Sequence, residues 1–123
     1  MGIDVYAEWR DQSNEDIGTQ VNAWLSTDRG DVGYLREAYH GAPYVTEYFC
    51  PEAFEPDGAA IAAATLRERL PGTLHLVELR ERKLYDASDA EIEAVKESYR
   101  KFVELCEAKE RETGESVRVR ASF

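Results

Sequence analysis

The stretch that decides the fold is residues 2–9, which read Gly2-Ile3-Asp4-Val5-Tyr6-Ala7-Glu8-Trp9. Apolar and polar side chains alternate along it, and successive side chains of a β-strand point to opposite faces. The stretch therefore predicts a strand with one buried face and one polar face. Residues 115–122 alternate in the same way, so a similar strand is expected at the other end of the sequence.

Two helices are marked by their N-caps. Ser88 and Glu91 form a capping box, and apolar residues follow at spacings of three and four, which predicts a helix over 89–112. Ser13 is the expected N-cap of a first helix over 14–25.

Proline guides the prediction in the centre of the chain. Residues 59–70 predict an Ala-rich helix, and Pro71 suits the first turn of a separate helix over 72–85. Upstream, residues 34–39 predict a short helix, and the aromatic and β-branched run 44–50 predicts a strand.

These elements predict one α+β domain over residues 1–123. We expect a small, largely antiparallel sheet that includes the N- and C-terminal strands and packs against several helices.

The charge balance excludes some partners. The 123 residues carry a formal net charge of -10, which argues against nucleic acid and against anionic membrane surfaces as partners. Only 4 of the 15 basic residues are Lys. This bias has two explanations that the sequence leaves open: adaptation to a salt-rich cytoplasm, or a GC-rich genome that favours Arg codons.

The sequence also favours a reduced, cytoplasmic setting. The first residues lack the basic and apolar regions of a signal peptide, and no apolar run approaches the length of a membrane span. Cys50 and Cys106 stand in apolar surroundings and are expected as two buried thiols rather than a disulfide. No metal-ligand or cofactor motif is present, so we expect neither a metal nor a cofactor.

Asp4 and Glu8 share the polar face of the first strand. Four residues of strand separate their backbones by roughly 13 Å, which is too far for a carboxylate dyad. We therefore expect them to form cross-strand ion pairs with Arg118 and Arg120 of the last strand. A catalytic role for Asp4 is the alternative.

Residues 34–48, which we call the tyrosine segment, gather the groups most suited to binding. The segment holds four of the seven tyrosines, together with Arg36, Glu37 and His40. Tyrosine offers a flat body with a polar tip, which suits recognition, and histidine can carry a proton near neutral pH. The alternative is that the tyrosines only cover a small core. The binding candidates are Tyr34, Arg36, Tyr39, Tyr44 and Tyr48.

Four stretches resemble a family of small uncharacterised bacterial proteins. They are residues 1–9 (MGIDVYAEW), 33–41 (GYLREAYHG), 51–55 (PEAFE) and 66–70 (LRERL). The resemblance covers most of the chain. It implies no activity, because the family has none assigned.

Two functions follow as hypotheses. The first is a non-enzymatic binding or accessory module that uses the tyrosine segment and self-associates through Leu76 and Leu79, which face away from the main apolar stripe of their helix. The second is a small enzyme acting on a polar or anionic metabolite, with His40 as acid and base, Arg36 binding the anion, and Glu37 or Asp4 in support. The enzyme requires these four residues to converge on one pocket.

Overall fold

The structure, a computed structural model, describes residues 2–23 and 29–123. Its strands are β1 (Gly2–Glu8), β2 (Tyr34–Ala38), β3 (Ala59–Ile61) and β4 (Val117–Ser122), and its α-helices are α1 (Asn14–Asn22), α2 (Val45–Phe49), α3 (Ala63–Tyr85) and α4 (Asp89–Thr113). The described residues also include the 3₁₀ turns η2 (Gly30–Val32) and η3 (Pro51–Phe54). The predicted α+β fold is confirmed.

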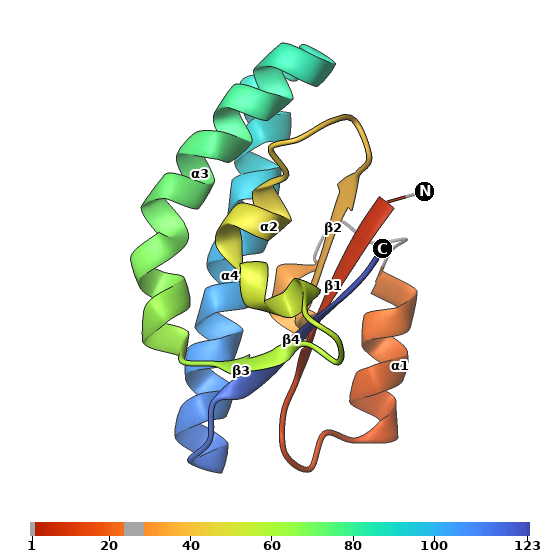
Figure 1. Ribbon diagram of the computed structural model, residues 1–123, viewed down its shortest axis with the longest axis vertical. Coiled ribbons are helices and arrows are strands. Elements are labelled where there is room, and N and C mark those ends of the chain that lie inside the picture. The colour runs from red at the N-terminus through yellow and green to blue at the C-terminus, as the bar shows by residue number, and fades with distance from the viewer. Residues whose placement is uncertain (1, 24–28) are drawn as a thin grey trace.

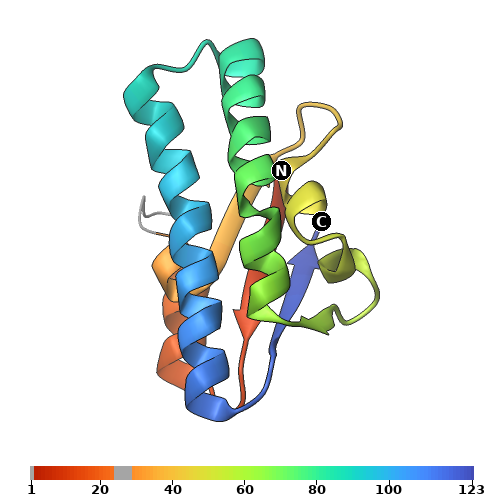
Figure 2. The ribbon, with the colours of Figure 1, turned by 90° about the vertical axis from the view of Figure 1, so that its left-hand side faces the viewer.

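The sheet has the strand order β2-β1-β4-β3, and all of its pairings are antiparallel. The first and last strands of the chain therefore lie next to each other at its centre. Helices α3 and α4 lie side by side on one face of the sheet, and α1 lies on the other (Figures 1 and 2).

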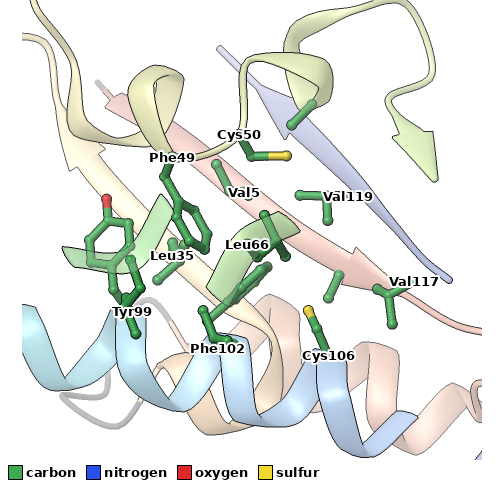
Figure 3. Packing of buried hydrophobic residues seen from close by; sticks show 14 of the residues in the cluster. Val5, Leu35, Phe49, Cys50, Leu66, Tyr99, Phe102, Cys106, Val117 and Val119 are labelled. Atoms are coloured by element: carbon green, nitrogen blue, oxygen red, sulfur yellow. The ribbon is translucent and has the colours of Figure 1, made fainter. Parts of the chain in front are cut away.

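The alternation of β1 builds the core as predicted. Ile3, Val5 and Ala7 are buried beneath α3 and α4. Phe49 of α2 lies at the centre of this core, edge-on to Phe102 of α4 (Figure 3). Both cysteines are free and buried in the same core, which confirms the expected pair of thiols.

The two capped helices are also as predicted. Ser88 and Glu91 form their capping box at the start of α4, and the apolar residues of α4 face the sheet. Ser13 caps α1, which ends at Asn22. The predicted continuation through Trp24 and Leu25 lies outside the described residues.

The tyrosine segment folds differently from the prediction, because tertiary contacts outweigh local propensity. Residues 34–39 are not a helix, since Tyr34–Ala38 form β2 and pair with β1. Residues 44–50 are not a strand, since Val45–Phe49 form α2. The carboxylate of Glu37 accepts hydrogen bonds from the backbone N–H groups of Val45 and Thr46, so a residue of β2 caps α2.

The predicted pair of helices 59–70 and 72–85 is in fact one helix. Residues 59–61 form β3, and α3 then runs unbroken past Pro71. Proline inside a helix costs about 3 kcal/mol. The cost is offset because Leu70 and Val77, on either side of Pro71, belong to one stripe buried against the core.

Gly30 allows the loop before β2 to approach α4 closely. A Cβ atom at this position would lie 1.9 Å from the carbonyl oxygen of Ser98 in α4. Only glycine fits this contact, which fixes the start of β2 against the helix and thereby positions the tyrosine segment.

The polar face of the sheet carries the predicted ion pairs only in part. Arg120 Nε donates to Glu8 at 3.0 Å, as expected. Asp4 instead pairs with Arg36 of β2, and Arg118 donates to the carbonyl oxygen of Asp57. The prediction for Asp4 is wrong because Tyr34–Ala38, expected as a helix, form β2 on that side of β1 and place Arg36 opposite Asp4.

Candidate functional site

A cleft of about 380 Å³ opens where β2, α3 and α4 meet. We call it the arginine cleft. Valine side chains form its apolar walls, and its polar lining is Arg29, Arg36, Glu37, Arg80, Glu81, Tyr85, Glu91 and Tyr99. The cleft therefore combines charges of both signs with phenolic hydroxyls.

Arg80 is the most enclosed charge of this cleft, with a side chain only 8% exposed. Its Nε lies 3.2 Å from Glu37, and its Nη1 donates to the carbonyl oxygens of Gly41 and Pro43. The guanidinium also lies over the ring of Tyr44, 5.3 Å from its centroid. The remaining nitrogen, Nη2, is buried and has no hydrogen-bond partner.

An unpartnered buried nitrogen of a charged group is costly, because hydrogen bonds to water are lost and nothing replaces them. Nη2 is the one buried side-chain polar atom without a partner in residues 2–23 and 29–123. Arg80 therefore offers a hydrogen bond that the described protein does not use.

Arg36 lines the cleft from β2 and is held by contacts within the sheet. Its Nη1 lies 2.5 Å from Asp4 Oδ1, and the hydroxyl of Tyr34 donates to the same oxygen. Burial, and then the hydrogen bond to Asp4, raise the pKa of Tyr34 to about 12. Tyr34 thus remains protonated and keeps donating at neutral pH.

Glu81 and Tyr85 continue the lining from Arg80 along α3, and Tyr99 faces them from α4. Burial raises the pKa of Glu81 above its usual value; nearby Arg80 lowers it in part, and Glu37 and Glu91 raise it further. Burial also raises the pKa values of Tyr85 and Tyr99. The carboxylate of Glu81 has no hydrogen bond or ion pair within the described part of the chain.

A second hollow, of about 410 Å³, lies beside the first. We call it the apolar groove. Residues 40–43 form one side, and Leu76, Leu79, Lys83 and Leu84 of α3 form the other, with Arg80 between the two hollows. The groove thus brings part of the tyrosine segment together with the two leucines predicted to mediate self-association.

His40 lines the apolar groove and not the arginine cleft. Its Nδ1 lies 2.6 Å from the hydroxyl of Tyr85, which does line the cleft. Of the four residues that the enzyme hypothesis requires, Arg36 and Glu37 face one cleft, Asp4 reaches it through Arg36, and His40 reaches it only through Tyr85.

The four tyrosines of the segment occupy different environments. Tyr34 is 1% exposed, and Tyr44 is partly buried against the core under Arg80. Tyr39 and Tyr48 are exposed. Only these last two present much of their rings to a partner.

Sequence reasoning missed Arg80, Glu81, Tyr85 and Tyr99. Arg80 had a readable signal, because it follows Val77 by three residues on the buried stripe of α3 and is a charge at an apolar position. Charged residues are rarely buried unless they are paired. The other three had no signal, since only the packing of α3 against α4 places them together.

Comparison with protein-family models, curated proteins and solved structures found no match. None of the helices within residues 2–23 and 29–123 is long and apolar enough to cross a bilayer. Over the same residues, no group of three or more His, Cys, Asp or Glu side chains is placed to hold a metal ion.

Proposed function

We propose that the protein is a binding module that holds a small polar ligand in the arginine cleft. The observation that carries the proposal is Arg80, which lines a cleft of ligand size and whose buried Nη2 has no hydrogen-bond partner. Small-molecule sites are typically hollows of this volume with apolar walls and a few convergent polar groups. A ligand oxygen at Nη2 would supply the missing hydrogen bond.

Binding, rather than catalysis by His40, fits the arrangement better. His40 lies in the neighbouring groove, and the Tyr85 hydroxyl stands between it and the cleft. A general acid or base must come within about 3 Å of the proton that it transfers, directly or through one water. Tyr85 and Tyr99 line the cleft, whereas His40 does not.

The test is a screen of small carboxylates, phosphates and amino acids by NMR of the ¹⁵N-labelled protein. We expect at least one compound to shift the amide signals of Tyr85, Val95 and Tyr99, which line the cleft. The signals of Glu15 and Thr19 in α1, on the far side of the sheet, serve as the internal control and should not move. If no compound moves the cleft signals at millimolar concentration, the proposal is wrong. Conversion of a bound compound would instead establish an enzyme.

Self-association through the apolar groove is a second candidate. The supporting observation is that Leu76 and Leu79 share the groove with residues 40–43, and that no Asp or Glu lines it. Two copies of a chain with a net charge of -10 repel each other least at a surface free of acidic groups. The proposed partner is therefore a second copy of this chain.

Sedimentation of the Leu79→Glu variant tests this candidate. Leu79 is 54% exposed, so the change should leave the fold intact and abolish dimers seen with the unmodified chain. Ile17→Glu is the matched control, because Ile17 is similarly exposed but lies on α1. A monomeric unmodified chain, at both low and high salt, would rule out self-association.

A further inference from the structure

We propose that the ligand of the arginine cleft is a small amino-carboxylate, such as a free amino acid in its zwitterionic form. This inference rests on the proposed function and adds the chemical class of the ligand. It assigns the carboxylate of the ligand to Arg80 and Tyr85, and its ammonium group to Glu81.

The carboxylate half follows from the donors. Nη2 of Arg80 is buried without a partner, and Tyr85, five residues further along α3, lines the same cleft. The hydroxyl of Tyr85 contacts His40 Nδ1 and can still donate to a ligand when His40 is the donor in that contact. Hydrogen bonds between a guanidinium and a carboxylate are charge-assisted and stronger than neutral ones. A carboxylate oxygen is therefore a favourable acceptor for the free nitrogen.

The ammonium half follows from the charge balance. Arg80 is already paired with Glu37, and Arg36 is paired with Asp4. Across the whole lining, three arginines face three glutamates, so the cleft has no excess of positive charge. A ligand that carried only negative charge would add it beside Glu37 and Glu81, and like charges in a partly buried site repel strongly. An ammonium group on the same ligand removes this conflict.

Glu81 is the acceptor suited to that ammonium. Its carboxylate lines the cleft, has no ion pair or hydrogen bond among the described residues, and is desolvated by burial. Glu91 stands on the facing helix, but one of its oxygens already accepts from the backbone N–H of Ser88. Within the described residues, the carboxylate of Glu81 thus has no cation bonded to it, and Nη2 of Arg80 has no acceptor.

The apolar walls leave room for a side chain. Val45, Val77 and Val95 line the cleft, and its volume of about 380 Å³ exceeds that of an amino-carboxylate backbone alone. The inference therefore specifies the ionic pair of groups and leaves the side chain to be found by the screen.

Calorimetric titration tests the inference in three steps. The twenty amino acids are first compared as ligands of the intact chain. The tightest is then compared with its deaminated acid and its decarboxylated amine, which each lack one ionic group. We expect the removal of either group to weaken the dissociation constant at least about tenfold, which corresponds to about 1.4 kcal/mol.

Two variants then separate the halves of the site. Glu81→Gln removes the charge that meets the ammonium, so it should weaken the amino acid at least about fivefold and leave the deaminated acid unchanged or tighter. Tyr85→Phe removes the hydroxyl and should weaken both compounds. Glu68→Gln makes the same change as Glu81→Gln at an exposed position of α3 and should alter neither affinity.

The outcomes distinguish a failure of the ligand class proposed here from a failure of the proposed binding function. If a carboxylate or phosphate without an ammonium group binds as tightly as any amino acid, the inference is wrong and the proposed function stands. The same holds if Glu81→Gln leaves amino acid binding unchanged while its melting temperature shows an intact fold. If no small molecule of any class binds, the proposed function fails and the inference fails with it.

Discussion

Glu37 has two structural tasks at once, because its carboxylate caps α2 and pairs with the buried Arg80. We expect Glu37→Ala to lower the free energy of unfolding by about 3–5 kcal/mol, since it leaves the guanidinium of Arg80 without its counter-charge. Glu37→Gln keeps one acceptor oxygen for the α2 N–H groups and should cost less. Urea unfolding measures both changes.

The control for this prediction is Glu47→Gln, an exposed position of the same short helix. It should change the free energy of unfolding by no more than about 0.5 kcal/mol. Equal effects of the substitutions at Glu37 and Glu47 would show that the buried pair has no special role.

Cys50 and Cys106 should be inert towards thiol reagents in the folded protein. Both are buried, and burial raises the pKa of each thiol to about 12. Because the thiolate is the reactive form, only about one thiol in ten thousand is ionised at pH 8. We expect negligible labelling by a chromogenic disulfide in buffer and two labelled thiols per chain in urea. Rapid labelling of the native protein would contradict the described packing.

At the scale of elements, the sequence predicted those whose pattern is set locally. The alternation in β1 and β4, the N-cap of α1 and the capping box of α4 each depend on a few neighbouring residues. Elements fixed by distant partners were missed. Tyr34–Ala38 is a strand because β1 pairs with it, and α2 is a helix because Glu37 caps it. The length of α3 depends on a buried stripe that continues past Pro71.

The site was predictable only where it coincides with the tyrosine segment. Arg36 and Glu37 were identified from composition, and both line the cleft. The α3 and α4 residues that complete the cleft were missed, because no spacing in the sequence brings residues 80–85 next to Tyr99. A cleft between elements is a property of their packing.

The contact between η3 and α3 should weaken in acid. Arg69 Nη1 and Nη2 donate to the two oxygens of Glu52 at 2.8 and 2.7 Å, and this lowers the pKa of Glu52 to about 2. A carboxyl whose pKa is lowered on folding stabilises the protein above its unfolded pKa, and this stabilisation is lost as the pH falls towards the folded value.

We therefore expect Glu52→Gln to cost about 1 kcal/mol at pH 6, since the pair is partly exposed. This difference should shrink as the pH falls from about 4.5 to about 2. Urea unfolding at pH 6, 4 and 2.5 provides the measurement. A difference that does not depend on pH would remove the charge interaction as its cause.

At the scale of the whole molecule, the net charge of -10 predicts a dependence on salt. Salt screens the repulsion between the acidic side chains of the folded chain, which stabilises the fold. Salt also weakens the ion pairs, but most of them are exposed and contribute little to the free energy of unfolding. If the acidic surface reflects adaptation to salt, the melting temperature should rise by about 5 °C or more between 0.05 and 2 M KCl. A flat profile would favour the codon-bias explanation.

The central position of β1 has a consequence for how the molecule reaches its fold. β1 pairs with β4, and the ion pair between Glu8 and Arg120 joins residues 112 positions apart. Contacts of such long sequence separation form late and slow down folding. The hairpin of α3 and α4 can form from local contacts. The backbone groups along one edge of β1, in contrast, remain unpaired until β4 pairs with them. A chain shortened by residues 117–122 would leave β1 with that edge exposed and β3 without its strand partner, and unpaired strand edges lead to aggregation.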